Sequence, residues 1–340
     1  MSKKRLGYID MAKGIGIILV VAAHVIGEGN KTFPGSNLLH GYIYSFHMPL
    51  FFIISGILLG YSLKTNSISV DYLKKKLRAL VRSLLIPYFL WSAIYFILDN
   101  SSINKADIYE WILCVVTFRG RAPIWFLGAL FWAEAFALVT IFITKQQKKF
   151  ILPVTAIVGG LSIISWSYCD LARDTSIFLN YCEVSVCRGL VCLFFVLFGY
   201  LIAPTIVKNI STVKLLLICG CSLLVSVLCF RVSDLGVNLH TFSISNIPVF
   251  FVTGVSGSST VLLLCKAIYN KLEFNGLERI GQDSMGIMCI HYTHLPFMQY
   301  ATDLCALFAL SGGYAFILSF SLVFVVSFLC TEILKRQSLV

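Results

Sequence analysis

The sequence has too little charge for a soluble protein. Only 13% of its 340 residues are charged, whereas 58% are hydrophobic. An ordinary globular chain carries about 25% charged residues, so a soluble enzyme is excluded because so few charges cannot cover a soluble surface. Intrinsic disorder is excluded as well, since 27 Phe, 15 Tyr and 5 Trp provide far more apolar surface than a disordered chain has. The composition is that of a polytopic membrane protein.

Common site signatures are also missing. The twelve cysteines contain no C-x-x-C pair, and most lie in apolar runs, where a thiol behaves as a small hydrophobic group. The histidines are scattered without an H-x-x-x-H pair, so we expect no metal site. The net charge of +11 requires no nucleic-acid partner, because basic residues collect on the cytoplasmic side of membrane proteins. With no repeat period and no room for a separate soluble domain, we expect one membrane-embedded domain over residues 1–340.

Long apolar runs predict the transmembrane helices. A bilayer core requires about 20 mostly apolar residues per helix. By that rule the chain has ten spans, at residues 11–27, 42–63, 84–98, 124–144, 150–167, 186–204, 213–230, 244–266, 283–300 and 313–334. Residues 108–118 are apolar but too short, and they fit an interfacial or re-entrant helix. The predicted fold is therefore an all-α polytopic membrane protein with about ten transmembrane helices.

The distribution of Lys and Arg predicts the orientation. If the N-terminus is inside, the cytoplasmic ends and loops contain 20 of the 27 basic residues. The opposite orientation would violate the positive-inside rule. We therefore expect both termini in the cytoplasm and a multi-pass protein of the inner (plasma) membrane.

Ionisable residues interrupt the first span. Lys13 and His24 share one helix face, because eleven residues make three turns plus about 20°, and Asp10 lies about 40° to the other side. Roughly 16 Å of helix separates Lys13 from His24. Ionisable groups inside a membrane usually face a cavity, a partner or a substrate path. Lys13 and Asp10 alone could snorkel to the cytoplasmic interface, whereas His24 lies too deep to do so and is a candidate functional residue.

Further polar residues lie in later spans. The second span places His47 in its outer part, at a depth that can meet His24. Pro49 breaks the helical hydrogen-bond ladder there, as at a bend that lines a cavity. Three other intramembrane polar residues are Glu134, Arg188 and His291. A structural role, such as an ion pair between Glu134 and Arg188, is as well supported as a role in chemistry.

A basic segment follows the second span. Residues 71–82 read D-Y-L-K-K-K-L-R-A-L-V-R, with five cations in nine residues: Lys74, Lys75, Lys76, Arg78 and Arg82. We expect a cytoplasmic loop that is either an anchor for anionic lipids or a phosphate site. Composition alone favours the lipid anchor, and a phosphorylated cytosolic cofactor would reverse that preference.

Four segments follow one another over almost the whole chain. The first is R-x4-D-x2-K-G-x9-H, from Arg5 to His24. The others are F-H-M-P-L-F-F through S-G (46–56), P-I-W-F-L (123–127), and G-Q-D-S-M-G-I (281–287) up to His291. In this order they resemble acyltransferase family 3, the integral-membrane O-acyltransferases that acetylate sugars, and the chain looks most similar to the branch of fucose 4-O-acetylases.

The resemblance implies acetyl-CoA as the donor and a hydroxyl of a glycan, glycolipid or lipid-linked sugar as the acceptor. The catalytic histidine of the family's R-x10-H motif corresponds to His24. The arginine of that motif is Lys13 here, which keeps the charge but loses the planar fork. Asp10 completes the candidate catalytic set. The substrate-binding candidates are His47, Trp125, Glu134, Arg188 and His291, and the coenzyme A candidates in the family's basic stretch are Lys75, Lys76, Arg78 and Arg82.

A histidine base suits this chemistry, because an alcohol is a poor nucleophile at neutral pH. His24 would take the hydroxyl proton, and His47 would donate to the oxyanion or orient the acceptor. A covalent acyl-histidine is an alternative. Since coenzyme A is cytosolic and His24 lies nearer the outside, the pantetheine arm is expected to thread a channel. Membrane lipids and a second copy of the chain are further expected partners, and a glycan transporter or flippase is the alternative function.

Overall fold

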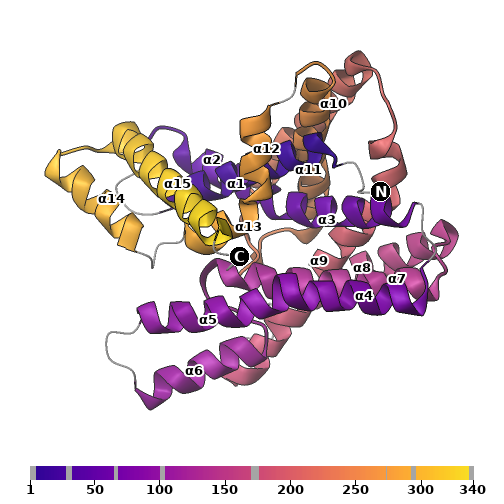
Figure 1. Cartoon of the computed structure of the whole chain (residues 1–340), viewed down its shortest axis with the longest axis horizontal. Coiled ribbons are helices and arrows are strands. Elements are labelled where there is room, and N and C mark those ends of the chain that lie inside the picture. The colour runs from indigo at the N-terminus through magenta and orange to yellow at the C-terminus, as the bar shows by residue number, and fades with distance from the viewer. Residues whose placement is uncertain are drawn as a thin grey trace. The chain divides into compact units, whose positions relative to one another are not determined.

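The computed structural model describes residues 5–27, 33–64, 68–99, 104–169, 176–272, 274–291 and 296–336. This part of the chain is almost entirely helical, with one two-stranded sheet formed by β1 (Val237–Asn238) and β2 (Ser243–Ile244) (Figure 1). Within these ranges, nine helices are long and apolar enough to cross a membrane. The prediction of an all-α polytopic membrane protein is confirmed.

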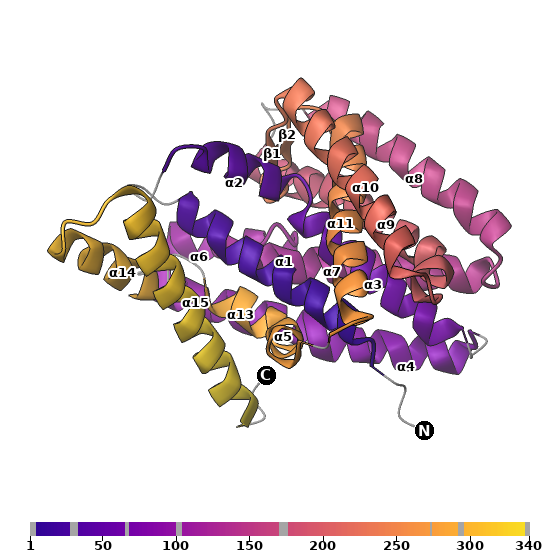
Figure 2. The same ribbon diagram turned by 90° about the horizontal axis from the view of Figure 1, so that it is seen from above.

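The chain forms two compact units, and unit 1 comprises Met1–Phe51, Ile210–Val237 and Val249–Val340. Its helices are α1 (Gly7–Ile26), α2 (Ser36–Tyr44), α10 (Thr212–Ser233), α11 (Ile247–Tyr269), α12 (Asn275–Gln282), α13 (Ser284–Ile290), α14 (Pro296–Leu307) and α15 (Gly312–Arg336). Helix α1 is the centre of this unit, because it packs against α2, α12, α13 and α15. Helices α14 and α15 pack together as a hairpin (Figures 1 and 2).

Two glycines let α1 and α12 approach closely. A Cβ atom at Gly14 would collide with the carbonyl oxygen of Leu277, and one at Gly281 would collide with the carbonyl oxygen of Asp10. The main chains therefore touch where larger residues would hold the helices 8–10 Å apart, the usual range. The same two glycines belong to the first and last motifs of the sequence analysis.

Unit 2 comprises Phe52–Asn209 and Asn238–Pro248, so α3 (His47–Leu63) begins in unit 1 and ends in unit 2. Its other helices are α4 (Val70–Leu80), α5 (Ile86–Asp99), α6 (Lys105–Val116), α7 (Trp125–Ile143), α8 (Lys148–Cys169) and α9 (Ile177–Val207). Helix α9 packs against α6, α7 and α8 (Figure 2). Glycines again permit close contact with α3, because a Cβ at Gly56 or Gly199 would collide with main-chain atoms of the opposite helix.

The basic segment is a helix, and the predicted loop is wrong. Ser69 caps α4 by accepting a hydrogen bond from the main-chain N–H of Tyr72 at 3.1 Å. The helix continues through a π-helical turn, Val81–Leu85, into α5, so the spanning helix covers Val70–Leu98 (Figure 1). The wide turn ends two residues before Pro87, which cannot donate a helical hydrogen bond. The run of Lys, Leu, Arg and Ala is rich in strong helix formers, and this outweighs its charge.

The span predicted at residues 283–300 is not one continuous helix. It contains α13, which has seven residues, and the beginning of α14, and residues 292–295 between them lie outside the described ranges. The other nine predicted spans each coincide with a helix of spanning length. The short segment 108–118 is helical as α6, with 12 residues. Its interfacial placement, the cytoplasmic termini and the single-domain organisation stay predictions.

Candidate functional site

Four imidazoles and one tyrosine form a histidine cluster in unit 1: His24, His40, Tyr44, His47 and His291. His24 lies in the last turn of α1, and its ring meets that of His291 edge-on, with centroids 5.1 Å apart. The ring of Tyr44 is 6.2 Å from that of His24, 4.3 Å from that of His40 and 4.9 Å from that of His47. The structure thus brings together three residues that the sequence singled out. It adds His40 and Tyr44, which the sequence analysis missed.

Local breaks in the helices position two of these rings. The chain turns at Ser45–Phe46, and His47 is the first residue of α3. Pro49 therefore lies in the first helical turn, where a missing N–H costs no helical hydrogen bond, and the break comes just before the predicted place. His291 follows the last residue of α13 in the same way. Both imidazoles therefore lie at a helix end rather than along a helix.

The hydrogen bonds of His47 and His291 fix their tautomers. Nδ1 of His47 lies 2.8 Å from the carbonyl oxygen of Ile43, and Nδ1 of His291 lies 3.1 Å from that of Ile287. Because a carbonyl can only accept, both Nδ1 atoms carry the proton, and Nε2 of each neutral ring keeps a lone pair. Neutral His47 can therefore orient a hydroxyl but cannot donate to an oxyanion from Nε2.

Burial distinguishes His24 from these two neighbours. His47 is 3% exposed and His291 is 1% exposed, whereas His24 is half-buried. Of the three histidines predicted from the sequence, His24 is the most accessible to a substrate.

The opposite end of α1 carries charged groups. The carboxylate of Asp10, which is buried, accepts hydrogen bonds from Nε of Arg5 at 2.6 Å and from Nζ of Lys13 at 3.4 Å. Lys13 therefore pairs with Asp10, three residues before it on the same helix. About 16 Å of helix separates this pair from His24, so neither residue belongs to the histidine cluster.

Two ion pairs that the sequence analysis missed lie among α12, α13 and α15. Arg279 contacts Glu332, and Lys335 contacts the buried carboxylate of Asp283. Asp283 stands in the motif G-Q-D-S-M-G-I, so that motif held the signal for one of them. The pairing with Glu332 raises the pKa of Arg279.

Unit 2 contains a second polar group, the arginine cluster, formed by Arg119, Trp125, Arg188 and His240. Arg188 is 1% exposed, and its guanidinium carbon lies 4.9 Å above the ring of Trp125. Its Nη1 donates to the carbonyl of His240 at 3.2 Å, and its Nη2 donates to the carbonyls of Phe118 and Arg119 at 2.7 and 3.2 Å. Two of the predicted substrate-binding residues, Trp125 and Arg188, thus lie together.

Glu134 is not the partner of Arg188. Its carboxylate accepts a hydrogen bond from the hydroxyl of Ser55. The hydrogen-bond acceptors of Arg188 within the described ranges are main-chain carbonyls. The ion pair offered by the sequence is therefore wrong, because the turn after α6 presents carbonyl groups to the guanidinium.

That turn and the β-hairpin are joined through His240. Phe118 and Gly120 both have positive φ, at 57° and 66°, and a Cβ at Gly120 would collide with the main chain of Trp125. The carbonyl of Gly120 accepts from Nε2 of His240 at 3.0 Å, and the imidazole stacks on the indole of Trp125 at 6.4 Å. Burial, together with the charges of Arg119 and Arg188, lowers the pKa of His240 to about 4.

The sequence analysis missed Arg119 and His240, because both lie between predicted spans. A signal existed for Arg119: the letters F-R-G-R lie one residue before the motif P-I-W-F-L. His240 had no signal, since only the fold brings the β-hairpin to the turn after α6.

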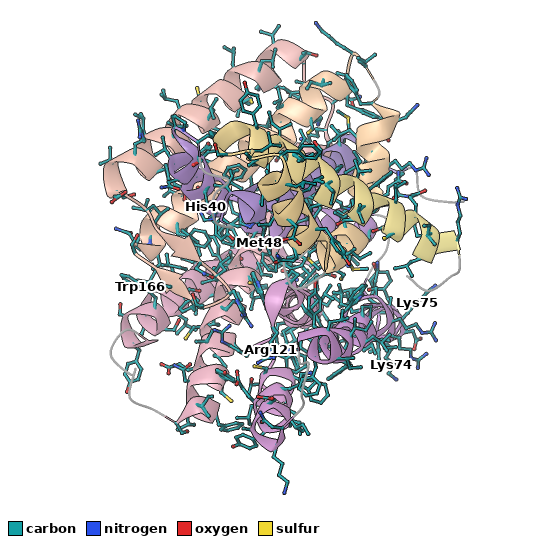
Figure 3. All side chains as sticks on the ribbon, turned by 90° about the vertical axis from the view of Figure 1, so that its left-hand side faces the viewer. His40, Met48, Lys74, Lys75, Arg121 and Trp166 are labelled. Carbon is teal, nitrogen blue, oxygen red and sulfur yellow. The ribbon has the colours of Figure 1, made fainter. Side chains whose placement is uncertain are left out.

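The coenzyme A candidates lie on α4 and on the π-helical turn that follows it. Lys74, Lys75 and Arg78 are exposed on α4, and Arg82 is exposed in the turn. Arg78 is three or four residues from each of the other three, which places the four cations on one side of the helix, and we call this side the basic face. Lys74 and Lys75 project together from the helix (Figure 3). Lys76 points elsewhere, with Nζ 5.9 Å above the ring of Tyr72, and is not part of the basic face.

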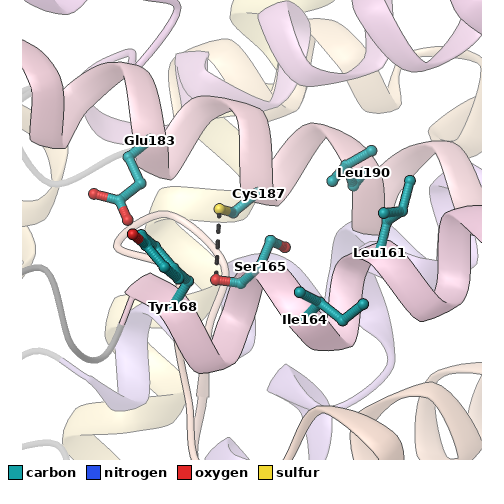
Figure 4. Close-up of a pocket in the computed structure, with 7 residues that line it drawn as sticks. All are labelled: Leu161, Ile164, Ser165, Tyr168, Glu183, Cys187 and Leu190. Carbon is teal, nitrogen blue, oxygen red and sulfur yellow. Dashed lines mark hydrogen bonds between the residues drawn. The ribbon is translucent and has the colours of Figure 1, made fainter.

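A groove of about 310 Å³ runs between α8 and α9 (Figure 4). Its lining residues are Leu161, Ile164, Ser165, Tyr168, Glu183, Cys187 and Leu190. Polar side chains occur mainly at one end, where Tyr168 and Glu183 lie close together (Figure 4). The groove contains none of the predicted site residues, and its apolar walls resemble an ordinary lipid-facing seam between two helices.

With this geometry in place, the comparisons with known proteins decide the family. The profile of acyltransferase family 3, described as an acyltransferase domain, matches residues 6–335. The chain belongs to this family. It is therefore a multi-pass membrane acyltransferase, and the resemblance found in the motifs is confirmed.

One curated relative also aligns with the chain. The nodulation protein NolL of Mesorhizobium japonicum is 30% identical over 162 residues. The alignment covers 41% of this acyltransferase and 43% of NolL, which is less than half of either protein. The similarity to fucose 4-O-acetylases stays a prediction.

Proposed function

We propose that this acyltransferase moves an acetyl group from cytosolic acetyl-CoA to a hydroxyl of a cell-surface glycan or lipid-linked sugar, with His24 as the general base. The observation that carries the proposal is the position of His24, half-buried in the last turn of α1 and in edge contact with the buried ring of His291. Acyl transfer to an alcohol needs a base whose pKa lies near the working pH, and histidine meets that need.

The reaction proceeds in two steps. The acceptor oxygen attacks the thioester carbonyl carbon while His24 removes the hydroxyl proton. The tetrahedral intermediate then collapses, the carbon–sulfur bond breaks, and the leaving thiolate recovers the proton from the His24 imidazolium. Tyr44 supplies an O–H donor for the oxyanion, because the neutral rings of His47 and His291 present lone pairs at Nε2.

The phosphates of coenzyme A bind to the basic face of α4. Four exposed cations on one face, Lys74, Lys75, Arg78 and Arg82, match a ligand that carries several phosphate charges. Lys13 and Asp10 act at the charged end of α1, on the donor side. This assignment keeps the donor's charged groups apart from the histidine that handles the proton.

The test of the base uses the purified full-length chain, acetyl-CoA and an exogenous sugar acceptor. Replacing His24 by Ala should lower kcat at least about 100-fold, because a positioned base contributes 10²–10⁴-fold, and should leave acetyl-CoA affinity unchanged. The matched variant His40→Gln, on α2, should stay within about fivefold of wild type, since His40 stacks on Tyr44 and handles no proton in this scheme. The base assignment fails if His24→Ala keeps more than a tenth of wild-type kcat. Acceptor-independent release of one equivalent of coenzyme A would favour an acyl-histidine instead.

A second test addresses the donor. Arg78→Ala and Arg82→Ala should each raise the KM for acetyl-CoA about tenfold or more, since a charge-assisted hydrogen bond contributes about 1.5–3 kcal/mol. Lys76→Ala removes the same charge beside the basic face and should change KM much less. An unchanged KM in the arginine variants would leave only the lipid-anchor role. Mass spectrometry of surface glycans from cells with and without the protein would identify the acceptor.

A further inference from the structure

Arg119 has its guanidinium held on one side, while two of its nitrogens donate no hydrogen bond within the described residues. Its Nη1 donates to the carbonyl of His240, and its guanidinium carbon lies 5.7 Å above the ring of Tyr181. Its Nε is buried, and neither Nε nor Nη2 donates a hydrogen bond to any residue in the described part of the chain. These two nitrogens form the edge that binds carboxylates and phosphates in a bidentate manner.

The positive charge of the arginine cluster has no carboxylate counterpart in the described ranges. The neighbouring Arg121 does have one, because its Nη2 lies 3.4 Å from the carboxylate of Glu110. Tyr181 donates to the same carboxylate oxygen at 3.4 Å. Glu110 is thereby engaged with groups other than Arg119 and Arg188. Burial lowers the pKa of Arg119, in keeping with a cation that lacks compensation.

Arg188 holds the groups that orient Arg119. It binds the carbonyl of Arg119 itself, and it shares the carbonyl of His240 with Nη1 of Arg119. Arg188 therefore fixes both the main chain of Arg119 and the acceptor that orients the Arg119 side chain. If Arg119 served only to connect the turn to the β-hairpin, the hydrogen bond from its Nη1 to the carbonyl of His240 would be enough. Leaving a donor such as Nε of Arg119 buried and unsatisfied is unfavourable, and a bound anion would remove that penalty.

We propose that Arg119 is the anion-binding residue of a second site, in which its Nε and Nη2 bind two oxygens of a carboxylate or phosphate group, with Arg188 as a positioning residue. The ligand class is a small acidic molecule, such as a sugar acid or a phosphate ester, or the phosphate of a lipid headgroup. The site stands on unit 2 alone and does not depend on the roles proposed for His24 and the basic face.

The experiment titrates purified full-length protein in detergent with inorganic phosphate, with glucuronate and with glucose, at constant ionic strength, by calorimetry. Saturable binding is expected for phosphate or glucuronate and not for glucose. Arg119→Gln should raise the Kd at least tenfold, and Arg119→Lys should raise it severalfold because lysine keeps the charge but lacks the fork. Arg121→Gln is the matched control, and its Kd should stay within twofold of wild type. The site is disproved if neither anion binds saturably, or if Arg119→Gln and Arg119→Lys, both folded by cooperative thermal unfolding, bind as wild type does.

The source of the phosphate is settled in nanodiscs. If the natural ligand is a headgroup, phosphatidylglycerol should compete with inorganic phosphate and raise its apparent Kd in the wild-type protein at least tenfold relative to phosphatidylcholine. If it is a free anion, the two lipids should give the same Kd. Either result supports the site, provided that Arg119→Gln abolishes the response.

Discussion

The histidine cluster of unit 1 and the arginine cluster of unit 2 differ in how their polar side chains are buried and held. In unit 1, the rings of His24, Tyr44 and His291 meet edge to edge or at a tilt, and His24 is half-buried. In unit 2, Arg188 is fully enclosed and held by main-chain carbonyls. The first arrangement keeps one imidazole, that of His24, partly accessible, and the second encloses a charged guanidinium.

The tautomers of the histidines show the same contrast. His47 and His291 donate from Nδ1 to a carbonyl and keep a lone pair at Nε2. His240 donates from Nε2 to the carbonyl of Gly120 and keeps its lone pair at Nδ1. In unit 1 the buried rings of His47 and His291 thus keep Nε2 as an acceptor, whereas His240 uses Nε2 to join two loops. A buried histidine is therefore not by itself evidence for catalysis.

The largest expected difference between the two clusters is in the free energy of unfolding, and it is tested at Arg188. Arg188→Met should lower the free energy of unfolding by about 2–5 kcal/mol, because the carbonyls of Phe118 and Arg119 lose their donor at roughly 1–3 kcal/mol each. His24→Ala should leave stability close to wild type. Thermal unfolding in detergent measures both. The matched variant Arg121→Met breaks only a part-exposed ion pair and should cost less than about 1 kcal/mol. Equal losses in the two arginine variants would contradict the distinction.

A smaller effect comes from the pH dependence of stability. The folded-state pKa of His240 is about 4, below the value of about 6.5 in the unfolded chain. The unfolded state therefore binds the proton first, and the stability due to neutral His240 is present above pH 6.5 and lost as the pH falls toward 4. Between pH 7 and pH 5 this loss should reach roughly 1–2 kcal/mol. Unfolding midpoints at the two pH values should differ less in His240→Gln than in the wild-type protein, and an identical slope would show that His240 does not contribute.

The smallest effect concerns Lys13, which is on the same helix as His24 but far from it. Lys13→Ala should raise the KM for acetyl-CoA about three- to tenfold with little change in kcat, because a partly exposed charge contributes roughly 1 kcal/mol. Asp10 should stay in place, since Arg5 still binds it. Lys13→Arg should match the wild-type enzyme. Steady-state kinetics with acetyl-CoA checks both variants, and a kcat loss as large as that of His24→Ala would place Lys13 in the chemistry.

Much of the fold follows from apolar runs alone. Nine predicted spans coincide with long helices, because a helix in lipid must satisfy every backbone group internally and therefore needs a long apolar run. Two segments, residues 71–82 and residues 283–300, differ from what their apolar and charged letters predict. The basic segment became a helix because a Ser69 cap and strong helix formers outweigh charge. The span predicted at 283–300 contains the end of α13 at Ile290 and the start of α14 at Pro296, because an average over the whole window does not register the polar letters, such as His291, that interrupt its apolar residues.

The candidate site was partly predictable for a similar reason. His24, His47 and His291 stand out because histidine is rare inside apolar spans. His40, Arg119 and His240 lie outside the predicted spans, where polar residues are ordinary. The partners of Arg188 are main-chain carbonyls of a turn with positive φ at Phe118 and Gly120. Side-chain letters do not encode such acceptors.

The contact of α1 with α12 constrains how this protein can vary. At Gly14 and at Gly281 the obstacle to a larger residue is the main chain of the opposite helix, at Leu277 and at Asp10. A compensating substitution can shrink a side chain, but none can remove a carbonyl oxygen. Among relatives these two positions should therefore each be glycine independently, with no covariation between them. In a mutagenesis library, no second-site change at positions 10 or 277 should rescue Gly14→Ala or Gly281→Ala.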